Sequence, residues 1–173
     1  ALIGTILLLS CNNKNENKWE ELKVNGSKYK ISEKAIIQTK SSFLDDVIIK
    51  LGVVSDIEGN LENAVKTAEI FRKEKVDAVV IAGDCYENEK IRINPIYPDS
   101  KNNVNEMIAG IKPYAFLYVP IFIIPGNHEE INVYNEAINK LKENYSNVIC
   151  INKKSVDLEG FNIVGLGGYH DKR

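Results

Sequence analysis

Acidic, amide and imidazole side chains follow three apolar segments of the chain, each at the point where the segment ends. These residues are Asp56 and Glu58 after residues 47–54, Asp84 after residues 77–82, and Asn127 and His128 after residues 119–124. Carboxylate, amide and imidazole groups are the ligands expected for divalent metal ions that activate water. The pattern therefore indicates a metal site that performs hydrolysis.

The residue types and their spacing predict separate tasks at such a site. Asp56 and Glu58 are two residues apart, so their side chains share one side of an extended segment. Asp84 can bridge two ions about 3.5 to 4 Å apart, a spacing that clamps a phosphoryl group during in-line displacement. Asn127 adds an oxygen ligand without further negative charge. His128 can protonate a leaving oxygen, because an unperturbed imidazole titrates near neutral pH.

Each of these residues alone also has a purely structural explanation. Asp56 and Asp84 are typical of turns and helix caps that follow a strand. Glu58 alone is typical of a solvated loop, Asn127 of a turn in the left-handed region, and His128 of a protein surface. Three consecutive strands that all end in such groups are improbable as turn chemistry alone, and this favours the metal site.

Strand and helix signals alternate from residue 47 onward, which implies right-handed βαβ units, a mainly parallel sheet and an α/β fold class. In such sheets ligands bind beyond the carboxyl ends of the strands. The predicted strands span residues 47–54 (largely buried), 77–82, 119–124 and 148–151, and the predicted helices span 60–75, 104–118 (with a break near Pro113) and 129–144. Residues 85–101 are predicted to form an irregular loop, and 156–158 and 162–164 a β-hairpin.

Composition limits the possible functions. The 173 residues, 44% of them hydrophobic, are enough for one ordinary domain. A net charge of -2 provides no global basic field, so no nucleic-acid-binding surface is evident. With two histidines, the chain cannot build a site from three or four imidazoles. A nucleotide-binding βαβ domain is disfavoured because no strand is followed by G-x-G-x-x-G or G-x-x-x-x-G-K-[ST].

The amino-terminal residues resemble the end of a lipoprotein signal segment. The apolar run 1–9 is too short to span a bilayer but fits the hydrophobic region of a signal peptide. Leu8-Leu9-Ser10-Cys11 resembles the bacterial lipobox, which predicts a lipid anchor at Cys11, a membrane as partner and a place in the bacterial cell envelope, on its periplasmic or extracellular face. A buried strand is the alternative. Residues 12–46 are predicted to be a polar linker or a small strand-bearing extension, with a solvated spacer favoured.

The blocks at the strand ends resemble the calcineurin-like metallophosphoesterase superfamily, which shows Asp-x-His, Gly-Asp and Gly-Asn-His-Asp/Glu in this order. The corresponding blocks are Asp56-Ile57-Glu58, Gly83-Asp84 and Gly126-Asn127-His128-Glu129, within a domain at residues 47–173. The resemblance implies a sandwich of two mixed or parallel β-sheets flanked by helices, of which this chain holds the N-terminal part. It also implies hydrolysis of phosphate mono- or diesters by a metal-bound hydroxide. Asp56 would bind the first metal, Asp84 both, Asn127 the second, and His128 would assist the leaving group.

The chain departs from the family pattern at two places. Glu58 stands where the family has histidine, which favours Mn²⁺ among the candidate ions Mn²⁺, Mg²⁺, Fe²⁺ and Zn²⁺. The later histidine blocks of the family are absent, and His170 is the only remaining candidate. We therefore expect a domain that is incomplete at its C-terminus and a poor enzyme as it stands. The alternative is a degenerate, non-catalytic phosphoesterase-like lipoprotein that binds a phosphorylated ligand or a protein partner.

Overall fold

The computed structural model describes residues 20–24, 27–31, 35–40, 49–86, 100–158 and 161–168. The predicted signal segment with Cys11, most of the predicted loop 85–101, and His170 lie outside these residues. Among the helices of the described ranges, none combines the length and the apolar character needed to cross a membrane.

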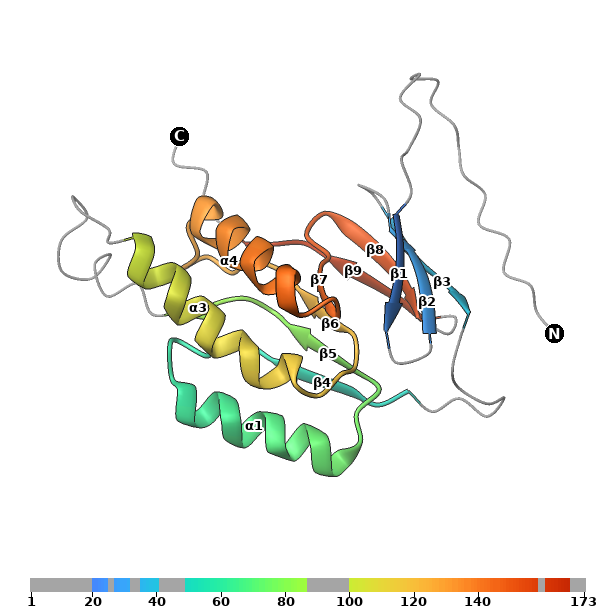
Figure 1. Ribbon diagram of the computed structural model, residues 1–173, viewed down its shortest axis with the longest axis horizontal. Coiled ribbons are helices and arrows are strands. Elements are labelled where there is room, and N and C mark those ends of the chain that lie inside the picture. The colour runs from blue at the N-terminus through green and yellow to red at the C-terminus, as the bar shows by residue number, and fades with distance from the viewer. Residues whose placement is uncertain are drawn as a thin grey trace, which may run out of the picture.

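Four parallel strands form the centre of the molecule, and the three described helices pack on one face of this sheet (Figure 1). The strands pair in the order β4 (Leu51–Val54), β5 (Ala78–Ile81), β6 (Ile121–Ile123) and β7 (Val148–Cys150). The helices are α1 (Leu61–Glu74), α3 (Ser100–Ala115) and α4 (Ile131–Asn144). The predicted α/β class with a parallel sheet is confirmed.

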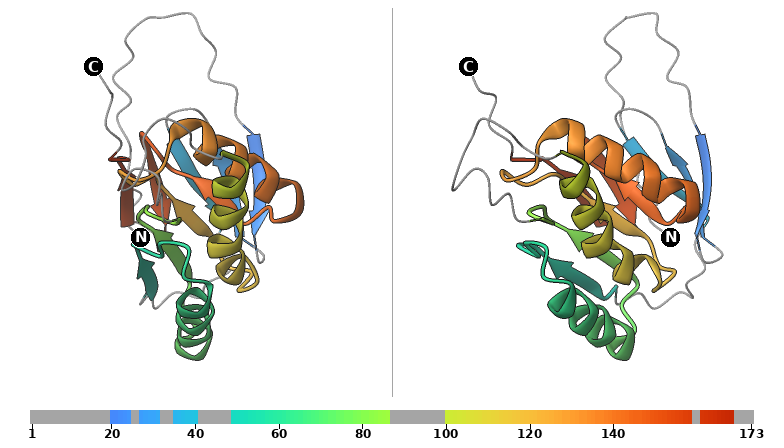
Figure 2. Two further views of the ribbon diagram at one scale, coloured as in Figure 1. Left: turned by 90° about the vertical axis from the view of Figure 1, so that its left-hand side faces the viewer. Right: turned by 60° about the vertical axis from the view of Figure 1, so that its left-hand side comes forward.

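A second sheet of five strands packs against the other face of the parallel sheet (Figure 2). Its order is β1 (Glu20–Val24), β2 (Ser27–Ile31), β3 (Ala35–Lys40), β8 (Lys154–Leu158) and β9 (Phe161–Gly165). All neighbours pair antiparallel except β3 and β8, which are parallel. β8 and β9 form the hairpin that the sequence predicts.

The favoured interpretation of residues 12–46 as a solvated spacer is wrong where the structure describes this stretch. Val24, Tyr29 and Ile36 are each less than 5% exposed. They lie in a core that also contains Val156 of β8. Strands β1, β2 and β3 are therefore an integral part of the second sheet, in agreement with the alternative prediction of a small strand-bearing extension.

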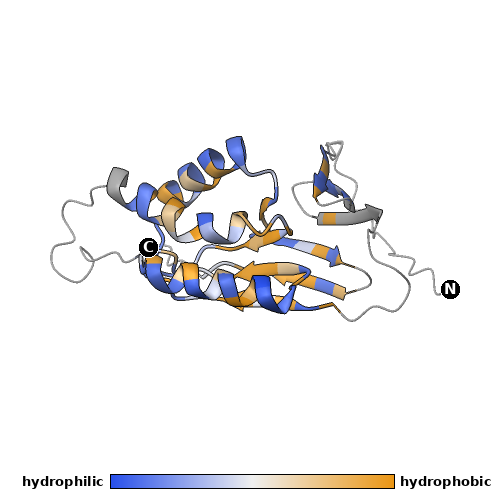
Figure 3. Ribbon diagram, turned by 60° about the horizontal axis from the view of Figure 1, so that its bottom comes forward, coloured by the Kyte–Doolittle hydropathy of each residue, from blue (hydrophilic) through white to orange (hydrophobic). Residues whose placement is uncertain are grey.

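The strands of the parallel sheet are apolar on both faces because each face is covered by another layer. Val79 and Ile81 of β5 pack among the helices, whereas Ala78 and Val80 pack against the second sheet. Figure 3 shows this arrangement as apolar strands lying between more polar outer elements. The structure is thus a three-layer stack of helices, parallel sheet and mixed sheet.

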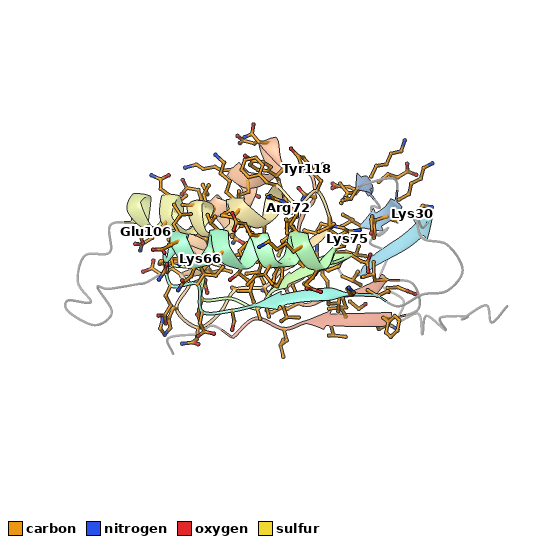
Figure 4. All side chains as sticks on the ribbon, turned by 90° about the horizontal axis from the view of Figure 1, so that it is seen from below. Lys30, Lys66, Arg72, Lys75, Glu106 and Tyr118 are labelled. Atoms are coloured by element: carbon orange, nitrogen blue, oxygen red, sulfur yellow. The ribbon has the colours of Figure 1, made fainter. Side chains whose placement is uncertain are left out.

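Helix α1 begins at the residue that its sequence predicts. The side chain of Asn60 caps it by accepting a hydrogen bond from the backbone N–H of Asn63 at 3.0 Å. The ring of Phe71 packs on Gly52 of β4, where a Cβ atom would lie 2.7 Å from the ring. Figure 4 shows α1 along its length, with Lys66 and Arg72 on the helix and β4 running beside it.

Two local predictions were wrong. β4 is an edge strand, so Leu51 and Val53 are 41% and 62% exposed instead of largely buried. Helix α3 does not break at Pro113 but continues to Ala115. A proline in the last turn removes one helix hydrogen bond close to where the helix ends anyway, so the helix tolerates it.

The turns after β5 and β6 touch each other at two glycines. Gly83 has a φ of 94°, and a Cβ atom there would lie 2.3 Å from the backbone nitrogen of Gly126. We expect Gly83→Ala to lower the free energy of unfolding by at least about 2 kcal/mol, because both the backbone conformation and the contact oppose a side chain. Urea unfolding followed by circular dichroism measures this change.

Gly168→Ala is the matched control, since no atom lies within 4 Å of a Cβ atom at this position. We expect its free energy of unfolding to stay within about 0.5 kcal/mol of the parent protein. Equal destabilisation by the two alanine substitutions would contradict the close approach of the two turns.

Candidate functional site

The loops that follow β4, β5 and β6 lie side by side at the carboxyl edge of the parallel sheet, on the left of Figure 1. The backbone N–H of Asp56 donates to the carbonyl oxygen of Gly83 at 3.3 Å. The N–H of Glu58 donates to the carbonyl oxygen of Asp84 at 3.0 Å. On the other side, the N–H of His128 donates to Oδ1 of Asp84 at 2.9 Å. The structure thus joins the loops of all three strands through Asp84 and its neighbours.

The buried side chain of Glu129 links the loop after β5 to the loop after β6 through hydrogen bonds. Its carboxylate accepts hydrogen bonds from three backbone N–H groups: Asp84 at 3.0 Å, Cys85 at 2.5 Å and Gly126 at 2.6 Å. The residue is only 3% exposed. Burying a carboxylate is unfavourable unless hydrogen bonds compensate for its lost hydration, and these three donors do so.

Glu129 is the structural residue of this site to which the sequence analysis assigned no role. It appears there only as the last member of the Gly126-Asn127-His128-Glu129 block. An acid three residues after the strand-ending Gly126 was the available signal, because such a turn leaves backbone N–H groups that need an acceptor.

Three acidic residues at this edge adopt left-handed backbone conformations. Asp56, Glu58 and Asp84 have φ angles of 54°, 46° and 55°. Residues other than glycine adopt this region at a cost, and such strain concentrates at functional sites. The hydrogen bonds between the loops hold these conformations in place. The hydroxyl of Ser55 also donates to Oδ2 of Asp56.

Burial is the largest cause of the pKa shifts of Glu129 and Cys85. It raises the pKa of the Glu129 carboxyl, while the three N–H donors act in the opposite direction and the charge of Asp84 adds to the increase. Burial also raises the pKa of the Cys85 thiol well above its usual value, with further increases from Glu129 and Asp84. Cys85 is therefore an enclosed, protonated core residue, although it adjoins Asp84.

The residues predicted as metal ligands differ in how far the structure brings them together. Asp56, Glu58 and Asn127 are exposed, whereas Asp84 and His128 are half-buried. Within the described ranges, no three His, Cys, Asp or Glu side chains are close enough to hold a metal ion. Hydrogen bonds therefore join the loops, but within the described ranges the side chains predicted as ligands do not form a cluster.

The donor chemistry of these loops nevertheless fits a hard divalent cation. One oxygen of Asp84 accepts the N–H of His128, which leaves the other as the atom for a cation. Asn127, one residue before His128, is exposed, and its side chain carries an amide oxygen. A full coordination shell requires donors in addition to these, from water or from protein.

We expect Glu129→Gln to lower the free energy of unfolding by about 1.5 to 3 kcal/mol, because a carboxamide turns an NH₂ group toward at least one of the three N–H donors. Thermal unfolding measures the loss. Glu136→Gln is the control, since Glu136 is exposed on α4 and pairs with Lys140 at 2.7 Å, a surface pair of small energy. A loss at position 129 no larger than at position 136 would show that the buried carboxylate does not fasten the loops.

Comparisons with known proteins agree with this fold. A crystal structure of TT1561 from Thermus thermophilus is similar, with a TM-score of 0.55 and 16% sequence identity over 70% of this chain and 50% of that chain. A second crystal structure has a TM-score of 0.55 and 15% identity over 68% of this chain and 52% of the other. This chain thus spans about half the length of the solved structures that it resembles. No curated protein matches it.

The sequence match to a family extends over most of the chain. Residues 49–173 match the family model described as calcineurin-like phosphoesterase. This range contains the parallel sheet, its helices and all three joined loops. The chain belongs to the calcineurin-like phosphoesterase family.

Proposed function

We propose that this chain forms the metal-binding part of a hydrolase that cleaves phosphate mono- or diesters at a dinuclear site. Membership of the calcineurin-like phosphoesterase family supports a metal-dependent phosphoesterase role in general. The observation that carries the finer proposal is the joining of the Asp56, Asp84 and His128 loops at one sheet edge. Divalent ions bound there would polarise the phosphoryl oxygens and activate water.

In this proposal each loop contributes a defined group. Asp84 lies between its neighbours and would hold both ions through its carboxylate, of which one oxygen also accepts the N–H of His128. Asp56 serves the first ion and Asn127 the second. His128 is half-buried, and its imidazole would give a proton to the leaving oxygen.

Glu58 would give the first ion an oxygen donor in place of an imidazole. Its exposed side chain follows a backbone held at φ 46° by the hydrogen bond to the Asp84 carbonyl. Carboxylate donors suit Mn²⁺ and Mg²⁺ better than softer ions, so we propose Mn²⁺ as the favoured metal. We further propose attachment to the bacterial cell envelope through a lipid at Cys11. Mass spectrometry of the native protein that finds Cys11 unmodified would exclude this anchor.

Asp84→Asn tests the central role of the bridging carboxylate. We expect hydrolysis of p-nitrophenyl phosphate and bis(p-nitrophenyl) phosphate with Mn²⁺ to fall by at least about 100-fold, because the amide replaces a charged donor for both ions. Steady-state kinetics with each ester measure the change and separate mono- from diesterase activity.

Asp77→Asn is the matched control, at the opposite end of β5. Its carboxylate accepts the N–H of Lys50 at 2.8 Å, which an amide oxygen can also accept. We expect its rate to match the parent protein. If Asp84→Asn and Asp77→Asn both kept the full rate of the parent protein, the result would contradict the assignment of Asp84.

Glu58→Gln tests whether Glu58, which stands where the family has histidine, binds metal. We expect the affinity for Mn²⁺ to fall by about 10-fold, because a neutral amide replaces a carboxylate donor. Metal content after dialysis, measured by mass spectrometry, reports this loss. Glu62→Gln on α1 is the control, since Glu62 is exposed and pairs with Lys66 at 2.5 Å. Unchanged metal content and rate in Glu58→Gln would exclude Glu58 as a ligand.

A further inference from the structure

A cavity of about 320 Å³ lies between the loop that carries Asp56 and Glu58, the first turns of α1, and α3. Its polar lining includes Ser55, Asn63 and Thr67, and Tyr114 of α3 contributes its side chain. A volume of this size holds a small organic group. The cavity shares Asp56 and Glu58 with the candidate metal site, so an occupant would lie directly beside that site.

Tyr114 provides the second observation that points to an occupant. The residue is 0% exposed, and its hydroxyl has no hydrogen bond of normal geometry, although it faces Thr67. Packing fixes the ring in this position, because its centroid lies 5.9 Å from that of Phe71. A buried hydroxyl without a partner is unfavourable, and a polar occupant of the cavity would satisfy it.

The groups that line the cavity define the chemistry of that occupant. No Lys, Arg or His is among the described residues of the lining, so the cavity offers no positive charge to a phosphate. Asn60 accepts the N–H of Asn63 through Oδ1, so its NH₂ group is left to donate elsewhere. Hydroxyl and amide groups of this kind match a neutral group that carries several hydroxyls, such as a sugar ring or a short polyol.

We propose that this cavity is the subsite for the hydroxylated alcohol portion of the phosphate ester, with Tyr114 and Thr67 as its specificity-determining residues. The inference rests on the proposed function, because it assigns the phosphate to the loops of Asp56 and Asp84. The hydrogen bond from Asp56 N–H to the Gly83 carbonyl holds the wall of the cavity against the Asp84 loop. Phosphate and alcohol portions of one ester can therefore occupy adjoining places.

The kinetic test compares a polyol ester with an aryl ester. We expect Tyr114→Phe to lower the ratio of kcat/KM for sn-glycerol 3-phosphate to kcat/KM for p-nitrophenyl phosphate by about 2- to 10-fold, the effect of one lost neutral hydrogen bond. Thr67→Val should lower the same ratio. Tyr134→Phe is the control, because it removes a buried hydroxyl that donates to the Ile123 carbonyl and lies outside the cavity lining. It should leave the ratio unchanged.

A binding measurement separates this inference from the proposed function. Saturation-transfer NMR of the metal-free chain with methyl β-D-glucoside, which has no phosphate, should show a signal that Tyr114→Phe weakens and Tyr134→Phe does not. This signal would support the subsite whether or not the chain hydrolyses either ester, so it tests the subsite separately from the phosphoesterase proposal. Turnover with an unchanged ratio in both Tyr114→Phe and Thr67→Val, and no glucoside signal, would show that the cavity holds only water and overturn the inference.

Discussion

The arrangement of the site depends on one buried carboxylate. Glu129 accepts three backbone N–H groups from the turns after β5 and β6, and these turns carry Asp84, Asn127 and His128. Without this acceptor, three N–H groups in a poorly hydrated region would have no partner, and the free-energy penalty for each would favour separation of the loops. The close contact between the backbones of Gly83 and Gly126 also depends on the two turns staying together, because it leaves no room for a side chain at Gly83.

The layers of the fold determine where this junction lies. Because β4, β5 and β6 are parallel neighbours, their carboxyl ends meet at one edge, and backbone hydrogen bonds between the loops extend the sheet pairing beyond the strands. Helices cover one face and the second sheet covers the other, so this edge is where polar groups can reach solvent. Asp56, Glu58 and Asp84, with their left-handed conformations, lie in the loops that these hydrogen bonds join.

The sequence predicted those features that depend on local pattern. The apolar runs identified the parallel strands, and the capping side chain of Asn60 identified the start of α1. It did not identify β1 to β3 as core strands, because lysines adjoin Val24 and flank Tyr29, and β8, the partner of β3, follows more than a hundred residues later. Nor did it reveal the role of Glu129, whose carboxylate accepts three backbone N–H groups. The ligand roles of Asp56, Glu58, Asp84, Asn127 and His128 stay predictions.

The most direct test of this account is to locate metal ions in the protein. Crystals soaked in MnCl₂ and measured at the manganese absorption edge give an anomalous difference map that shows ion positions independently of any assay. Our account predicts anomalous peaks beside the carboxylate of Asp84, between the loops of Asp56 and Asn127. Full occupancy of manganese elsewhere, with no peak at Asp84, would contradict the assignment of a metal centre to these joined loops.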